Sequence, residues 1–303
     1  MKLGVILLNW NNGLATAAAA RMAYGWKSCN PAIFVIDNGS ADNCRGALAA
    51  ECPRANYLYS KDNVGYGGGN NLGIKKAIGA GCDTIMLLNN DAVMREGDVA
   101  QLGRTLAGDR KVGVVGPALK ETTRDGKPAW FLGGRDITRH IRTHRQVDEA
   151  GLRELRSGGP ISVDYIPGTV FMARSYMFRN IGLLEEEYFF SGETADFCEL
   201  VRRSGLTVLV DPQAEAVHDV DHGSVVRETL YRYYNLRNRF LFMRRHRVSR
   251  RGVLIPFWAA CGLAMVVATA ARLKFDSAHA AWLGLRDGLA GRFGNRNVAI
   301  IGI

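Results

Sequence analysis

Residues 61–91 read KDNVGYGGGNNLGIKKAIGAGCDTIMLLNND, and this stretch contributes most to the predicted fold. Four glycines crowd the segment 65–69, a helix is predicted over 70–80, and a buried strand over 84–90 ends directly before Asp91. Glycines ahead of a helix commonly let the backbone approach a phosphate group closely. The stretch therefore predicts a phosphate-binding turn, with the carboxylate of Asp91 at the end of the next strand.

Two common phosphate-binding motifs do not fit this turn. A dinucleotide-binding fingerprint places GxGxxG directly after the first strand. Here the first strand is followed by NWNNG at 9–13, and the glycines come only after the third strand. A Walker P-loop requires Gly-Lys-Ser/Thr, whereas this chain has LGIKK at 72–76. A tight turn that uses glycine only for its backbone freedom is the alternative.

Strand and helix signals alternate through the first half of the chain. The predicted strands are 3–9, 32–37, 56–60, 84–90 and 112–117, and the predicted helices are 14–24, 70–80 and 98–106. Continuous apolar strands separated by helices indicate an α/β fold with a mostly parallel central sheet, covered by helices on both faces. Ligands of such sheets bind beyond the carboxyl ends of the strands. Asn9, Asp37 and residues 89–91, which close three strands, are therefore expected to line one crevice.

Two carboxylates at strand ends have both a functional and a structural interpretation. Asp37, in VIDNGSAD, either accepts hydrogen bonds from a base or ribose, or caps a turn or helix. Asp91 is well placed to bind Mg²⁺ or Mn²⁺, hard ions that use few protein oxygens and complete their shell with phosphates. Its alternative is again a turn at the end of a strand.

The second half has weaker signals. Residues 120–160 are polar, basic and rich in glycine, with little periodicity, and we expect a mobile excursion over the crevice. Regular structure resumes at VDYIPGTVFMAR, residues 163–174. A helix is then predicted to begin near Thr194, and a further strand to cover 206–212.

Composition limits the class of protein and its partners. With 303 residues, 47% hydrophobic and 22% charged, the chain is long enough for a folded protein of one large domain plus an appendage. The net charge of +10 favours an anionic partner: nucleic acid, an acidic membrane surface or a phosphorylated ligand. Six scattered cysteines without a CxxC pair suit reduced thiols in the cytoplasm. The apolar start, MKLGVILLNWNN, is too short for a signal peptide and predicts a buried strand.

The sharpest change in composition falls near residue 227. Residues 227–251 are aromatic and strongly basic, and the next twenty, GVLIPFWAACGLAMVVATAA at 252–271, carry no charge. This boundary predicts one large domain over 1–226 and a helical region over 227–303. The uncharged run either spans a bilayer, lies on anionic lipid at the inner face of the cell membrane, or forms a buried helix of a small subdomain or a homodimer interface.

Several motifs together resemble the family-2 glycosyltransferases of the GT-A fold, particularly the rhamnosyltransferase-like branch of polysaccharide assembly. They run in the family's order across about 3–239: LLNWNN, VIDNGSAD, DNVGYGGGNNLGI, LLNND, DYIPGTVFMAR, GLLEEEYFFSGETADFCELVRRSG, AEAVH and YYNLRN. The resemblance implies a metal-dependent inverting glycosyltransferase of cell-surface polysaccharide synthesis. Its donor would be a nucleoside-diphosphate sugar (dTDP-rhamnose, or a UDP-hexose as the alternative), and its acceptor a glycan or lipid-linked glycan. On this interpretation 1–116 binds the donor and 161–226 forms the acceptor side.

The resemblance also assigns roles to individual residues. Asn9 and Asp37 would bind the nucleoside, and the turn 63–71 would support the nucleotide-sugar site. Asp91 takes the place of the last acidic residue of the family's Asp-x-Asp motif, which holds Mg²⁺ or Mn²⁺. His218, after AEAV, is either a second metal ligand or a structural histidine. The predicted nucleotide-sugar-binding residues are Asn9, Asn11, Asp37, Asn63, Gly65, Gly69, Asn70, Asn90 and Asp91.

One departure from the family concerns the catalytic base. The family usually has Glu-Asp-x-Asp on the acceptor side, with the Asp of the Glu-Asp pair as base, but here that position is Thr194. Inverting transfer requires a carboxylate that takes the proton of the acceptor hydroxyl. Glu193 is the predicted replacement and Asp196 the second candidate. If neither serves, the enzyme is impaired or uses another residue.

A nucleotide- or nucleic-acid-binding protein without transfer activity is the competing class. It is motivated by the positive charge and by Thr194. In YRYYNLRNRF, residues 231–240, aromatic residues alternate with arginine as in some RNA-binding segments. We expect instead a helix with a Tyr/Leu/Phe core face and a separate arginine face, and no nucleic-acid partner. HDVDH at 218–222 lacks the other ligands of a closed zinc site.

Overall fold

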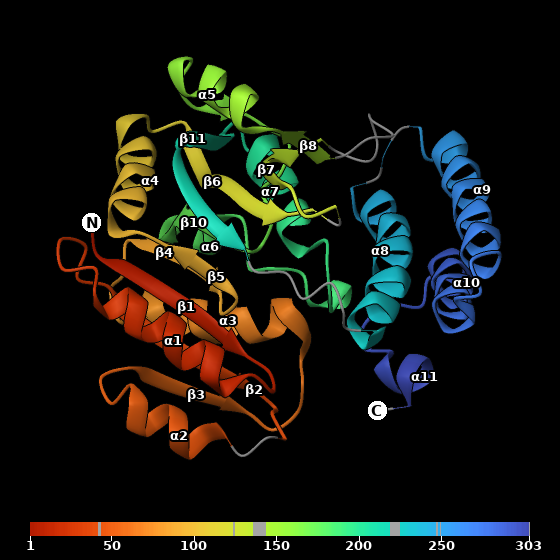
Figure 1. Ribbon diagram of the computed structural model, residues 1–303, viewed down its shortest axis with the longest axis horizontal. Helices are drawn as coiled ribbons and strands as arrows, with labels where there is room; N and C mark the ends of the chain where they lie inside the picture. Colours follow the sequence, from red (N-terminus) through yellow and green to blue (C-terminus); the bar gives the residue numbers. More distant parts are fainter. Residues whose placement is uncertain are drawn as a thin grey trace.

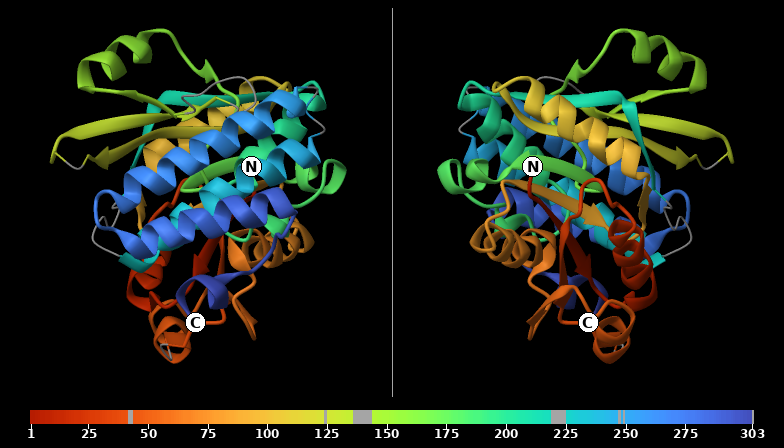
Figure 2. Two further views of the ribbon diagram at one scale, coloured as in Figure 1. Left: turned by 90° about the vertical axis from the view of Figure 1, so that its right-hand side faces the viewer. Right: turned by 90° about the vertical axis from the view of Figure 1, so that its left-hand side faces the viewer.

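The computed structural model describes residues 1–41, 44–123, 125–135, 144–218, 225–246, 248 and 250–302 (Figure 1). The part of VIDNGSAD at 42 and the part of HDVDH at 219–222 lie outside the described residues. One large sheet with helices on both faces makes up most of the molecule, and a group of C-terminal helices lies to one side of it (Figures 1 and 2).

The N-terminal half alternates strands and helices as predicted. Its elements are β1 (Leu3–Asn9), α1 (Gly13–Tyr24), β2 (Ala32–Asn38), α2 (Cys44–Glu51), β3 (Asn56–Ser60), α3 (Gly65–Gly79) and β4 (Thr84–Asn89). The four strands are parallel in the order β3-β2-β1-β4. Asn9 pairs with Asp37, and Leu8 pairs with Asn89. The polar carboxyl ends of three strands therefore lie side by side.

The sheet continues beyond β4 with mixed strand directions. Antiparallel β10 (Val170–Arg174) lies between β4 and β6 (Val112–Thr122), and β11 (Thr207–His218) follows parallel to β6. Short β5 (Ala92–Met94) pairs with the end of β11. Other elements between β4 and α8 are α4 (Glu96–Gly108), β9 (Ile161–Ser162), α6 (Ser175–Asn180), the 3₁₀ helix η1 (Glu186–Tyr188) and α7 (Glu193–Arg203). The path of β11 explains how His218, far along the chain, reaches the region of Asp91.

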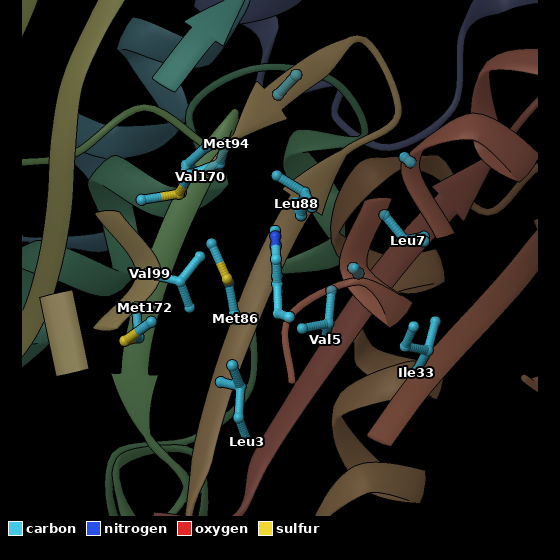
Figure 3. Close-up of a cluster of buried hydrophobic side chains, with 14 of the residues drawn as sticks. Leu3, Val5, Leu7, Ile33, Met86, Leu88, Met94, Val99, Val170 and Met172 are labelled. Atoms are coloured by element: carbon cyan, nitrogen blue, oxygen red, sulfur yellow. The ribbon is translucent and has the colours of Figure 1, made fainter. Parts of the chain in front are cut away.

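Alternate residues of each strand enter different layers of the core, because successive side chains point to opposite faces of a sheet. Figure 3 shows one layer, in which Val5 and Leu7 of β1 lie beside Met86 and Leu88 of β4. Ile6 and its neighbours pack on the opposite face with α3 and α7 residues. Both faces are therefore covered, which explains the continuous apolar strands.

The prediction of a mobile excursion over 120–160 is wrong for the described residues. β6 extends to Thr122 and pairs with antiparallel β7 (Pro128–Gly134), and β8 (His144–Val147) pairs with β7. α5 (Glu149–Ser157) follows, with Leu152 buried. These elements are short, and most of their polar residues are exposed.

The helix after β3 begins at Gly65 and not at residue 70, so the glycines lie in the first turns of α3. Close packing on β1 explains them. A Cβ at Gly69 would lie 2.3 Å from Leu8 Cδ1, and one at Gly73 would lie 2.6 Å from Ile6 Cγ2. Gly65 has φ +78°, and a Cβ there would lie 2.5 Å from the carbonyl oxygen of Phe189. The predicted turn is therefore a helix N-terminus pressed against the sheet and the loop before α7.

The C-terminal region is helical, as predicted. It comprises α8 (Val225–Arg245), α9 (Arg251–Ala270), α10 (Phe275–Ala290) and α11 (Asn297–Ile301). α8 lies against the sheet domain, and α9 and α10 lie on its outer side (Figures 1 and 2). The expected separation of α8 into a core face and an arginine face is wrong in one respect, because Arg237 is fully buried on the core side.

Candidate active site

Asn9 and Asp37 lie together at the carboxyl ends of β1 and β2. Asn9 is fully buried, and its Nδ2 donates to Asp37 Oδ1 at 3.3 Å and to Ser40 Oγ at 3.1 Å. Its Oδ1 accepts a hydrogen bond from Thr16 Oγ1 at 2.8 Å. Both the nitrogen and the oxygen of the Asn9 side-chain amide are therefore hydrogen-bonded within the protein. Asn9 orders Asp37 and the loop at Ser40.

Asn11 and Asn90 brace the loops on either side of this pair. Asn11 has φ +52°, and its Oδ1 accepts a hydrogen bond from the backbone nitrogen of Ala41 at 2.7 Å. Asn90 Nδ2 donates to Thr16 Oγ1 at 2.8 Å. Thr16 of α1 therefore connects the ends of β1 and β4.

The start of α3 is held by asparagines. Asn63 Oδ1 accepts from the backbone nitrogen of Gly65 at 2.8 Å and from Asn38 Nδ2 at 3.0 Å. Asn38 Oδ1 in turn accepts from the backbone nitrogen of Val64 at 3.0 Å. Asn70 bonds within the helix, its Nδ2 donating to Tyr66 O at 2.9 Å. These contacts fix the N-terminal end of α3 next to the carboxyl end of β2.

Asn71, the last residue of the predicted turn 63–71, joins α3 to the segment 184–186. Its buried amide donates to the carbonyl of Leu184 and to Glu186 Oε1, both at 2.9 Å, and accepts from the backbone nitrogen of Leu184 at 3.0 Å. Tyr66 makes a second connection, donating its hydroxyl hydrogen to the carbonyl of Gly168 at 2.7 Å. α3 is thus hydrogen-bonded both to the residues just before β10 and to the residues at the start of η1.

Asp91 and His218 meet because Ala92 of β5 pairs with His218 of β11. Asp91 Oδ2 lies 3.4 Å from His218 Nε2, and His218 Nδ1 lies 2.7 Å from Glu121 Oε1. Burial would lower the pKa of His218, but these two carboxylates outweigh it and raise that pKa to about 9. Burial would raise the pKa of Asp91, but His218 and the nearby Arg227 together lower it.

This pair suits a divalent metal ion. Asp91 Oδ1 and His218 Nε2 are buried and have no hydrogen-bond partner among the described residues. Glu121 holds the other ring nitrogen, the arrangement that orients a histidine for a metal. No cluster of three His, Cys, Asp or Glu side chains with metal-binding geometry occurs in the described parts of the chain. Two protein ligands with the remaining positions left to phosphate and water are typical of Mg²⁺ and Mn²⁺ sites.

Glu193 is the first residue of α7 and follows Gly192, which has φ +114°. Its side chain is 2% exposed, and Oε1 has no hydrogen-bond partner in the structure as described. Burial raises its pKa to about 7, against the lowering effects of backbone amides and of Arg237. Burial also raises the pKa of Tyr66, and the charges of Glu193 and Asp91 both add to this effect. The two carboxylates are therefore both close enough to the Tyr66 phenol to affect its pKa.

Asp196, the second candidate base, has a different environment. Its Oδ1 accepts from Tyr188 Oη at 3.0 Å and Arg245 Nε at 3.0 Å, and lies 2.8 Å from His246 Nε2. Burial would raise its pKa, but the hydrogen bonds from His246 and Arg245 lower it overall. Asp196 is thus a charged, fully bonded anchor, whereas Glu193 keeps an available oxygen.

A model of the family described as glycosyl transferase family 2 matches residues 14–176, which is more than half of the chain. The chain belongs to glycosyltransferase family 2. The match contains Asp37, all of α3 and Asp91, whose arrangement is described above, and begins after Asn9. It ends before Glu193, so the acceptor side rests on the geometry alone.

Curated relatives of this family-2 chain are similar at low identity. A low-salt glycan biosynthesis hexosyltransferase, Agl10, of Haloferax volcanii is 25% identical over 209 residues, 68% of this chain and 65% of that protein. The dTDP-rhamnosyl transferase RfbF of Shigella flexneri is 22% identical over 236 residues, 73% of this chain and 74% of the relative. An N-acetylglucosaminyl-diphospho-decaprenol L-rhamnosyltransferase of Mycobacterium tuberculosis is 23% identical over 209 residues, 63% and 67% of the two chains. The chain thus spans about two thirds of the length of the first and third relatives.

Solved structures confirm the predicted GT-A fold of this family-2 chain. A mannosyltransferase of Pyrobaculum calidifontis, PcManGT, in complex with GDP-Man and Mn²⁺ has a TM-score of 0.61 at 13% identity, and the match covers 96% of this chain and 88% of that one. GalNAc-T7 with UDP, GalNAc and Mn²⁺ also has a TM-score of 0.61, at 15% identity, covering 80% and 48%. At such identities the likeness shows the fold alone.

The structure brings together most of the predicted site of the family-2 chain and adds residues that the sequence did not indicate. Asn9 and Asp37 form one group, and Asp91 and His218 another. Glu121 was missed because it lies in the segment expected to be mobile. Arg245 and His246, which hold Asp196, were counted only as part of a basic run. Because they lie about 50 residues from Asp196 in the sequence, no local pattern indicates the contact.

Proposed function

We propose that this chain is a metal-dependent inverting glycosyltransferase of cell-surface polysaccharide synthesis. It transfers a sugar from a nucleoside-diphosphate donor to a glycan or lipid-linked glycan. One observation carries the proposal: the buried Glu193, with a pKa of about 7 and an unbonded oxygen, and Asp91 of the Asp91–His218 pair both act on the charge of the Tyr66 phenol. This supports a site in which the base and the diphosphate-binding centre are close to each other.

In this proposal Asp91 and His218 hold Mg²⁺ or Mn²⁺. When bound, the ion would neutralise the negative charge that develops on the leaving diphosphate. Arg227, whose charge lowers the pKa of Asp91, adds a second positive group on this side. Asp37, oriented by Asn9, accepts hydrogen bonds from the nucleoside of the donor. The N-terminal turns of α3 separate the site of the nucleotide sugar from the site of the glycan acceptor.

Glu193 acts on the acceptor in the same proposal. Its carboxylate takes the hydroxyl proton while the acceptor oxygen attacks the anomeric carbon, and the bond from that carbon to the diphosphate breaks on the opposite face. A base works best when its pKa lies near the operating pH, and burial places Glu193 in that range. Asp196 stays the second candidate, but its hydrogen bonds to Tyr188, Arg245 and His246 favour a supporting role.

Rhamnose from a dTDP donor is the proposed sugar, and a UDP-hexose is the alternative. The support is that two curated relatives are named rhamnosyltransferases, one of them a dTDP-rhamnosyl transferase. A third is named a hexosyltransferase. All three identities are low, so a direct assay decides between the donors.

A donor panel tests the proposed function. The full chain is incubated with dTDP-rhamnose, UDP-glucose, UDP-galactose and GDP-mannose, each with Mn²⁺, with Mg²⁺ and with EDTA. We expect release of nucleoside diphosphate from one donor, dependent on the metal and stimulated by a lipid-linked acceptor. Tight RNA binding that no nucleotide sugar affects, with no donor consumed, would instead support a nucleic-acid-binding protein without transfer activity.

We further propose that the protein docks on the inner face of the cell membrane through α9. Among the described residues, α9 is the helix long and apolar enough to cross a bilayer, yet only 17% of its apolar window is buried. Val253, Leu263 and Val267 are 73%, 52% and 62% exposed and are spaced to lie along one side of the helix. The opposite side packs on the protein, where a Cβ at Gly262 would contact Leu236 of α8 and Leu285 of α10.

A helix with one packed side and one exposed apolar side fits docking in the plane of the membrane better than spanning. Basic residues lie at both ends of α9, with Arg250 and Arg251 at its start and Arg272 and Lys274 after its end. Each such residue near an anionic surface contributes about 1 kcal/mol of attraction.

Fractionation of cells that express the full chain tests this docking. High salt screens only the charge attraction, so we expect it to release part of the protein and detergent to release the rest. The double change Leu263→Glu and Val267→Glu is expected to abolish binding to phosphatidylglycerol vesicles. Leu14→Glu, at an exposed apolar residue of α1, is the matched control and should leave vesicle binding unchanged. A fully soluble protein in plain buffer, whether monomeric or dimeric through α9, would contradict the proposal.

A further inference from the structure

One face of α8 is directed at the segment 185–196, which carries the proposed base. Tyr234, Arg237 and Asn238, Leu241 and Phe242, and Arg245 and His246 recur at intervals of three or four and therefore share this face. Successive turns of α8 along this face all contact the segment. Tyr234 stacks on Phe189, Leu241 and Phe242 pack on Tyr188, and Arg245 and His246 bind Asp196.

Arg237 and Asn238 form the centre of this face, and they bind backbone carbonyls. Arg237 Nη2 donates to the carbonyls of residues 187 and 188 at 2.9 and 2.7 Å. Asn238 Nδ2 lies 3.0, 3.0 and 2.6 Å from the carbonyls of residues 188, 190 and 191. Arg237 Nε also donates to Asn238 Oδ1 at 2.9 Å, which orients the amide toward the loop.

The loop that they hold has an unfavourable backbone. Phe189, Ser191 and Gly192 have φ values of +62°, +71° and +114°, directly before Glu193. Non-glycine residues rarely adopt this left-handed region, and such conformations persist only where surrounding structure imposes them. Hydrogen bonds from α8 to four of the five carbonyls over 187–191 supply that constraint.

Arg237 also lies close enough to affect the charge of Glu193. Its guanidinium is fully buried, reaches Gly294 O at 2.6 Å, and lies over the rings of Tyr233, Tyr234 and Phe293. The groups that face Glu193 are Tyr66 of α3, Tyr188 of η1, Asp196 of α7 and Arg237 of α8. Arg237 is the cation in this set, and it lowers the pKa of Glu193.

We propose that Arg237 and Asn238 are positioning residues for sugar transfer, which hold the backbone over 187–191 so that the Glu193 carboxylate faces the acceptor hydroxyl. The inference rests on the proposed function and extends it. It makes α8 part of the catalytic unit, although composition places it beyond the predicted domain boundary at 226. It also gives a role to YYNLRN, residues 233–238, which the donor and metal sites do not explain.

Substitutions in the full-length chain separate positioning from a merely structural role. Arg237→Lys keeps the charge but replaces the planar fork of donors by one ammonium group. We expect kcat to fall about 10- to 100-fold, as for a displaced reacting group, while donor KM and Mn²⁺-linked nucleotide binding stay within about twofold. Arg232→Lys is the matched control: it makes the same change on the same helix, where Arg232 pairs with Glu228, and should leave kcat unchanged.

The pH profile gives a second readout. Arg237→Gln removes the positive charge, so Glu193 should hold its proton more tightly and the acid limb of kcat should move to higher pH. Arg237→Lys should leave that limb in place. A kcat unchanged within about twofold in folded Arg237→Lys, or an acid limb that stays in place in Arg237→Gln, would overturn the proposal.

Hydrogen exchange of the peptide containing 187–193 is measured alongside and does not depend on activity. We expect faster exchange in Arg237→Lys, because the amides of Phe189 and Phe190 bond within this loop. If Arg237→Lys does not fold, Asn238→Ser, which introduces no charge, carries the same test. A wild-type protein that transfers no sugar would refute the proposed function. An active wild type with undiminished variants would refute the positioning role alone.

Discussion

Glu193→Gln is expected to lower kcat for sugar transfer by about a hundredfold or more, the scale of losing a general base, and to leave donor affinity unchanged. Gln has nearly the same volume and still fits the buried site at the start of α7, but its amide cannot take the acceptor proton. The measurement is steady-state transfer together with calorimetric binding of the nucleoside diphosphate with Mn²⁺. In the wild type the acid limb of kcat should fall near pH 7, because only the deprotonated carboxylate is active and burial raises its pKa to about 7.

Asp196→Asn and Thr194→Asp are the companion variants. Asp196→Asn removes a charge that accepts bonds from Arg245 and Tyr188, so we expect a lower melting temperature as well as lower activity. Thr194→Asp introduces a carboxylate at the position where the family usually has one, and is expected to restore part of the transfer that Glu193→Gln loses. Intact turnover in Glu193→Gln, with none in a folded Asp196→Asn, would identify Asp196 as the base.

Asp91→Asn is expected to abolish metal-linked donor binding while the protein keeps its fold. Asp91 is partly exposed at the end of a strand, so its charge contributes little to packing. Without it, the proposed ion loses a ligand, and His218 loses one of the two carboxylates that raise its pKa. Calorimetry with nucleoside diphosphate should show binding with and without Mn²⁺ become equal.

Glu121→Gln provides a graded control for the same centre. Glu121 contacts only the far ring nitrogen of His218, so its loss should weaken metal-linked binding by about 10- to 100-fold, the usual scale for an outer partner. Metal-linked binding that persists unchanged in Asp91→Asn would show that the ion, if any, is held elsewhere.

The donor half could be predicted from the sequence because buried parallel strands leave a strong signal. The apolar runs at 3–9, 32–37 and 84–89 locate β1, β2 and β4, and parallel register then brings their polar ends together. The start of α3 could not be located in this way. Glycines signal a turn by their backbone freedom, whereas those at 69 and 73 serve close packing of α3 on β1.

The acceptor half was less predictable because its contacts join distant segments. Glu121 reaches His218 through the pairing of β6 with β11, and the two residues are 97 positions apart in the sequence. In the sequence, Arg237 alternates with aromatic residues in the same way as the other arginines of 231–240, so it could not be told apart from an arginine on the helix surface. Its burial follows from the carbonyls of a loop about 50 residues away in sequence, and no local pattern encodes that contact.

The orientation of α8 affects how this enzyme could be recombined with its relatives. A designer who chose exchange points by composition would cut near residue 227 and graft the helices of one protein onto the donor half of another. Such a hybrid would pair one parent's Arg237–Asn238 with the other parent's 187–191 backbone, and every hydrogen bond between them is sensitive to small shifts. The unit to exchange is instead 183–302 taken whole, because α8 also bonds to residues of the C-terminal helices, as Arg237 does to the carbonyl of Gly294. Hybrids with a single crossover in the 181–183 connection should stay active, whereas hybrids cut at 227 should fold and bind donor but transfer slowly.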